Sequence, residues 1–163
     1  MPLLYGEMKP DRTRVSAMGR RLVVLWALIP LPFWVTITTG GPDGLLRHAI
    51  FHPVYVMLLI GAILLLRRLR SATDSRVVRG FALSIVVAQA AAIAGMIGEE
   101  IAVLQHGGLS AGREVFRAPL HMWSARITIP GLLSSQILLL GLTIASVVAM
   151  RAEQRLTASS HQL

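Results

Sequence analysis

The sequence contains no cysteine. Disulfide bonds, thiolate zinc sites, iron–sulfur clusters and dithiol redox chemistry are therefore excluded, and a metal would need histidine, carboxylate or backbone ligands. Charged residues are also scarce, at 15% of the 163 residues, against about 25% in ordinary globular domains. With 54% apolar residues and a mean hydropathy of +0.64, so small a chain could not bury its apolar surface in water. The composition therefore predicts an integral membrane protein.

Four long stretches lack Lys, Arg and Asp altogether. A membrane-spanning helix needs about 20 mostly apolar residues, and the stretches that qualify are residues 22–39, 49–66, 81–104 and 127–150. They predict an all-α protein, a four-helix transmembrane bundle over residues 22–150, with a basic tail at 1–21 and a second tail at 151–163. Pro30 and Pro32 predict a kink in the first helix.

The arginines and the one lysine are divided unevenly between the two sides of this bundle. Twelve of the 16 cationic residues lie in the two tails and in the loop between the second and third helices. The positive-inside rule then places both termini in the cytoplasm and the loops 40–47 and 105–126 outside. The cytoplasmic side carries the whole net charge of +8, which fits contact with anionic lipids in a bilayer. We therefore expect a protein of the cytoplasmic membrane of a bacterium, with no nucleic-acid partner.

Two adjacent carboxylates, Glu99 and Glu100, lie near the end of the third helix. They follow an 18-residue stretch, Phe81 to Gly98, that has no ionisable group. A carboxylate at this depth is costly unless it is paired, protonated or metal-bound. We expect at least one of the two to face the bundle and to pair with a His or Arg, and both are candidate catalytic residues. The alternative is that both reach interfacial water or pair with loop arginines.

Four histidines are expected on the same extracytoplasmic side as these carboxylates, because the helices alternate in direction. His48 and His52 begin the second helix, His106 follows the third and His121 precedes the fourth. The spacing of four between His48 and His52 places two imidazoles on one helix face, although Pro53 disfavours helix at the residue before it. The alternative is a set of unconnected interfacial histidines.

These residues predict a cofactor site at one membrane surface. A zinc, copper or iron ion would take its ligands from His48, His52, Glu99 and His106. A single haem b would take His52 as one axial ligand and His106 or His121 as the other. The leading hypothesis is thus a His/carboxylate site for redox or hydrolytic chemistry. Other interpretations stay open: a non-catalytic accessory subunit of a larger membrane complex, a homo-oligomer, and a small-solute or proton-coupled transporter. The sequence does not decide whether the chain is an enzyme.

Overall fold

The computed structural model describes residues 12–38 and 44–160. Within these ranges the chain forms helices and no strand, which confirms the all-α prediction. The elements are α1 (Arg12–Leu28), α2 (Pro30–Thr38), α3 (Gly44–Ser71), α4 (Arg76–Gln105), two short 3₁₀ helices, η1 (Gly108–Ser110) and η2 (Arg113–Arg117), and α5 (Pro119–Ser160).

The helices extend beyond the apolar stretches at most of their ends, into segments that contain polar residues. The α3 helix runs through Pro53 without a break. The α5 helix starts at Pro119 and continues into the basic C-terminal segment. The first predicted span is divided at Ile29, directly before Pro30, as expected where a proline supplies no N–H and restricts the residue before it.

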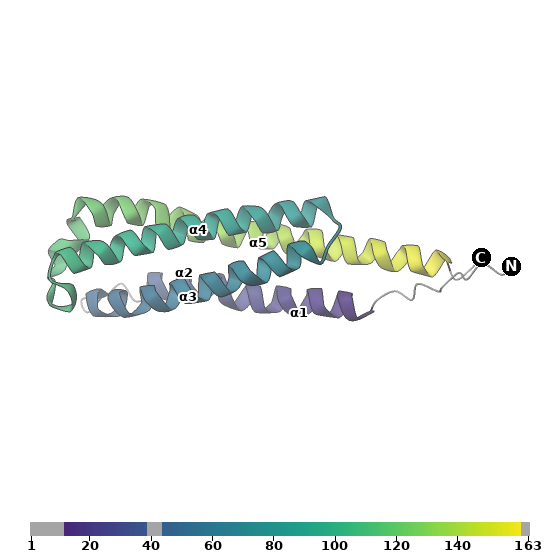
Figure 1. The fold of residues 1–163 in the computed structure, drawn as a ribbon, viewed down its shortest axis with the longest axis horizontal. Coiled ribbons are helices and arrows are strands. Elements are labelled where there is room, and N and C mark those ends of the chain that lie inside the picture. The colour runs from purple at the N-terminus through teal and green to yellow at the C-terminus, as the bar shows by residue number, and fades with distance from the viewer. Residues whose placement is uncertain (1–11, 39–43, 161–163) are drawn as a thin grey trace.

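The long helices run side by side in alternating directions (Figure 1). The α4 helix packs most extensively against α5 and next against α3, whereas α1 packs against α3 and α5. One end of the bundle, here called the site end, holds the end of α4, the two 3₁₀ helices and the start of α5. The other end, here called the arginine end, holds the turn between α3 and α4, which is flanked by Arg67, Arg68 and Arg70 on α3 and by Arg76 and Arg79 on α4.

The buried positions of each long helix alternate in steps of three and four residues. On α4 the buried stripe is Val78, Ala82, Ile85, Gln89, Ala92, Met96 and Glu99. On α3 it is His52, Tyr55, Leu59, Ala62, Leu66 and Leu69. This is the heptad spacing of helices that supercoil around one another with a left-handed twist, so the core consists of successive layers along the bundle.

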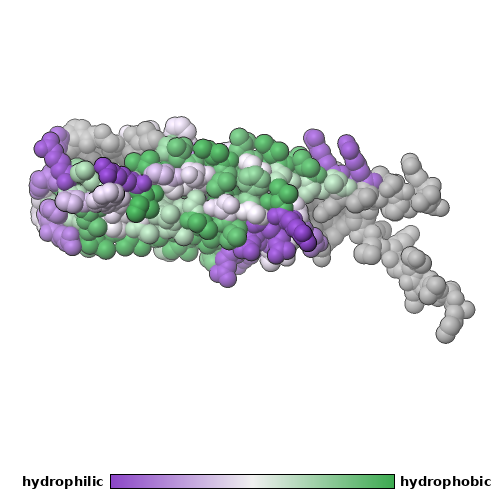
Figure 2. Space-filling model, turned by 90° about the horizontal axis from the view of Figure 1, so that it is seen from above, coloured by the Kyte–Doolittle hydropathy of each residue, from purple (hydrophilic) through white to green (hydrophobic). Residues whose placement is uncertain are grey.

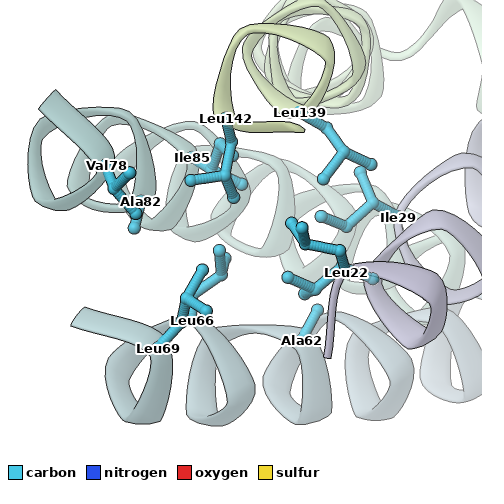
Figure 3. Packing of buried hydrophobic residues seen from close by; sticks show 11 residues of the cluster. Leu22, Ile29, Ala62, Leu66, Leu69, Val78, Ala82, Ile85, Leu139 and Leu142 are labelled. Atoms are coloured by element: carbon cyan, nitrogen blue, oxygen red, sulfur yellow. The ribbon is translucent and has the colours of Figure 1, made fainter. Parts of the chain in front are cut away.

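Two apolar clusters fill most of these layers. The large apolar cluster lies toward the arginine end and consists of Leu22, Leu25, Ile29, Ala62, Leu66, Leu69, Val78, Ala82, Ile85, Leu139 and Leu142 (Figure 3). The small apolar cluster lies toward the site end and consists of Tyr55, Leu59, Ala92, Met96 and Leu132. Gln89 occupies the layer of α4 between the two clusters.

Glycines let α4 and α5 approach closely near the site end. A Cβ on Gly95 would lie 2.8 Å from both the Ser124 carbonyl oxygen and the Thr128 backbone nitrogen. On the opposite helix, a Cβ on Gly131 would lie 2.7 Å from the carbonyl oxygen of Ala88. Small residues at such contacts are typical of helix pairs in membranes. They bring side chains of α4 and α5 within bonding distance of one another.

The outside of the bundle is apolar along its length. Val23, Met57, Leu104 and Ile137 are each more than 60% exposed, and on the face shown in Figure 2 the hydrophobic colour fills the middle while hydrophilic residues gather toward the ends. Four helical segments are long and apolar enough to span a membrane, namely residues 17–35, 50–71, 76–105 and 119–152. Surfaces of this kind require lipid or another apolar partner.

Candidate functional site

The most unusual side chain near the site end is Glu99, which is only 3% exposed on the buried stripe of α4. Its helix phase follows from the heptad spacing, since Glu99 comes three residues after Met96 and seven after Ala92, both fully buried. A buried carboxylate is tolerated only where neighbouring groups compensate its charge or hold its proton. The surroundings of Glu99 provide both kinds of group.

One carboxylate oxygen of Glu99 is held by a hydroxyl. Thr128 Oγ1, on α5, donates a hydrogen bond of 2.6 Å to Glu99 Oε1. The same hydroxyl oxygen lies 3.1 Å from the carbonyl oxygen of Ser124, one turn earlier on α5. The close approach of α5 to Gly95 places this hydroxyl within reach of α4. A hydroxyl–carboxylate hydrogen bond of this length is strong and fixes the orientation of the carboxylate.

The other carboxylate oxygen of Glu99 faces two buried imidazoles. His121 Nε2, from the start of α5, lies 3.6 Å from Glu99 Oε2, and His52 Nε2, from α3, lies 4.0 Å from the same oxygen. Both histidines are buried. Through its two oxygens, the Glu99 carboxylate on α4 therefore lies close to side chains of both α3 and α5.

Glu100 contacts His52 from a less buried position than Glu99. Its Oε1 atom lies 3.1 Å from His52 Nδ1, and its side chain is 24% exposed, whereas the side chain of His52 is 2% exposed. His52 thus has a carboxylate near each ring nitrogen. We call His52, Glu99, Glu100 and His121 the acid–histidine cluster, and within it Glu100 is the member most open to the outside.

The connection between α4 and α5 covers the cluster. Val115 in η2 is fully buried and packs with Ala102 and Val103 of α4, and Phe116 packs against this group. The Phe116 ring also meets the His121 ring edge to face, with centroids 5.2 Å apart. The 3₁₀ helix η2 therefore shields His121 with apolar side chains rather than leaving it in solvent.

The structure brings together four of the six residues that the sequence singled out. His106 lies apart from them: it is exposed at the C-terminal end of α4, where its Nδ1 is 2.8 Å from the carbonyl oxygen of Ala102. His48 belongs to α3, but its side chain lies outside the part of the chain that the structure describes. Thr128 and Ser124, which sequence reasoning missed, complete the site.

The described side chains as they stand form neither of the predicted cofactor sites. Among residues 12–38 and 44–160, no group of three or more His, Asp or Glu side chains is placed so that it could hold a metal ion. For haem, His52 and His121 both face Glu99 Oε2, so a carboxylate lies where two axial imidazoles would need iron and a flat macrocycle between them. What the geometry provides is two carboxylates and two imidazoles in close contact.

No protein-family model, no curated protein and no solved structure matches this chain.

Proposed function

We propose that this chain is a four-span protein of the cytoplasmic membrane, with both termini in the cytoplasm, that responds to extracytoplasmic pH. The acid–histidine cluster is its proton-binding site. One observation carries the proposal: the buried Glu99 carboxylate lies between two buried imidazoles and a hydroxyl donor, with Glu100 at the edge of the group. Histidine is the side chain that titrates nearest to neutral pH.

The charges of the cluster explain why a proton would matter to the fold. With both glutamates ionised and both histidines neutral, four adjacent groups carry two negative charges, and two added protons neutralise them. Burial penalises an uncompensated charge. A protonated His52 could donate toward Glu100 from Nδ1 and toward Glu99 from Nε2, so protonation would strengthen the attraction of α3 for α4. Proton uptake is then a local electrostatic event that changes helix packing.

The path of proton exchange favours a sensor over a proton-coupled transporter. Glu100 is the most exposed member of the cluster, so it is the expected exchange group with the outside. Toward the arginine end, the large apolar cluster fills the layers from Ile85 to Val78, together with Leu139 and Leu142 (Figure 3). These side chains cannot carry a proton. This supports proton exchange between the acid–histidine cluster and solvent at the site end only.

Proton binding can be measured directly on the full chain in lipid nanodiscs. Infrared difference spectra between about pH 8 and about pH 4 bracket the ordinary range of His and Glu titration. We expect carboxylate and imidazole bands from buried groups in the native chain, and Glu99→Gln should remove the part of the carboxylate signal that comes from Glu99 while retaining the size of the side chain. Asp74→Asn, at an exposed turn, is the matched control. An unchanged difference spectrum in Glu99→Gln would overturn the proposal.

A divalent metal ion is a second candidate, favoured by one contact. The approach of Glu100 Oε1 to His52 Nδ1 at 3.1 Å resembles the carboxylate that orients a metal-binding imidazole through its other nitrogen. His52 Nε2, His121 Nε2 and Glu99 Oε2 would then have to move closer around the ion. Elemental analysis separates the two functions: stoichiometric zinc, iron or copper that is lost in His121→Ala would favour the metal. If neither metal binding nor proton binding were detected, the accessory-subunit function would be favoured.

A further inference from the structure

A second polar feature lies deeper in the bundle, outside the acid–histidine cluster. Gln89 is 0% exposed, and neither its Oε1 nor its Nε2 has a hydrogen-bond partner among the described residues. It lies on the buried stripe of α4, ten residues before Glu99, which is about 15 Å along a helix. Its amide has two donor hydrogens and an acceptor oxygen, none of which the described residues satisfy.

A third buried polar group lies between Gln89 and the cluster. Tyr55 is 3% exposed, and its hydroxyl also lacks a hydrogen-bond partner within the described part of the chain. It follows His52 by one turn of α3 and belongs to the small apolar cluster with Leu59, Ala92, Met96 and Leu132. Tyr55 and Gln89 therefore extend the polar interior from the site end toward the middle of the bundle.

Several small side chains lie near the level of Gln89. The contact of His52 with Glu99 sets the register of α3 against α4, and it places Ala62 opposite Gln89. On α5, Ser135 comes one turn after Gly131, which lies against Ala88 and Ala92. Ser135 is fully buried, and its hydroxyl donates to its own helix at Gly131. Ala62 offers Gln89 no polar group, and the Ser135 hydroxyl already donates to its own helix.

We infer that the Gln89 side chain forms an internal water-binding site in the middle of the bundle. A buried amide in an apolar membrane bundle needs partners for its polar atoms, and water can both accept from Nε2 and donate to Oε1. A lipid or a second copy of the chain cannot supply these partners, because no atom of Gln89 reaches the surface. The large apolar cluster bounds the site toward the arginine end.

The water is detected by magnetisation transfer in NMR. Full-length chain with ¹⁵N-labelled glutamine is placed in nanodiscs, and the Gln89 side-chain signal is identified by its loss in Gln89→Leu, or in Gln89→Met should the first variant fail to fold. We expect transfer from water to the Gln89 amide. The exposed Gln105 amide is the positive control.

The result is independent of the proposed proton-binding function. Absence of transfer to Gln89, with normal transfer to Gln105, would overturn the water site and leave the infrared result on Glu99 untouched. Conversely, an unchanged infrared spectrum in Glu99→Gln would overturn the proton-binding site without affecting the Gln89 signal.

Discussion

Thr128 Oγ1 donates a hydrogen bond of 2.6 Å to Glu99 Oε1, which joins α5 to α4 across 29 residues of sequence. Both side chains are buried, so water cannot replace the bond if it is lost. The bond also holds one oxygen of the carboxylate and leaves the other facing the two imidazoles. Thr128 is therefore the residue that determines how Glu99 is presented to His52 and His121.

Removing this hydroxyl should destabilise the bundle. Thr128→Val keeps the shape of the side chain but leaves Glu99 Oε1 without its donor, and we expect the free energy of unfolding to fall by about 1–3 kcal/mol. Denaturation in mixed detergent micelles measures the change. Ser135→Ala is the control, because the Ser135 hydroxyl bonds only to its own helix among the described contacts. Equal losses in the two variants would contradict the role given to Thr128.

His106, which follows α4, and His121, at the start of α5, should contribute differently to the pH difference spectrum. His121→Ala removes an imidazole beside Glu99, so we expect about half of the imidazole signal of the cluster to disappear from the pH difference spectrum. His106→Ala should leave that signal intact, because His106 is exposed and bonded to its own helix at Ala102. Infrared spectra of both variants in nanodiscs provide the comparison. A larger effect from His106→Ala would place the site elsewhere.

The close contact of α4 with α5 should tolerate no added methyl group. A Cβ on Gly95 would meet backbone atoms of α5 at 2.8 Å, so Gly95→Ala should force the helices apart and lower stability by about 1–3 kcal/mol. Gly80→Ala, on the same helix, has open space around its added Cβ and should raise stability by about 0.5–1 kcal/mol. Thermal unfolding of the two variants tests both signs together.

The proposed orientation can be tested with single cysteines, because the chain has none of its own. Ser110→Cys in η1 should react with a membrane-impermeant thiol reagent added to intact cells, whereas Thr73→Cys in the turn between α3 and α4 should react only after the cells are opened. The expectation follows from the distribution of arginines. The reverse pattern would move the acid–histidine cluster to the cytoplasmic side.

Hydropathy was sufficient to predict the number and order of the four candidate spans, because a run of about 20 apolar residues has the length that a bilayer-spanning helix requires. It also placed Glu99, Glu100, His52 and His121 near one end. Helix phase was harder: whether His106 or His121 turns inward depends on where α4 ends and how η1 and η2 lead into α5. Thr128 gave no signal in isolation. The glycines at 95 and 98, which permit α5 to approach, were the available clue.

The alternating steps of three and four on α3 and α4 have a consequence for how the chain avoids misalignment. A repeat of seven would let one helix slide along another by about 10.5 Å and again match large apolar residues with large apolar residues. Such a slip would carry Glu99 to the level now held by Ala92, among Leu59 and Leu132, and would leave Thr128 and His121 with no acid opposite them. The charged layer therefore selects a single alignment from several that the apolar residues alone would accept.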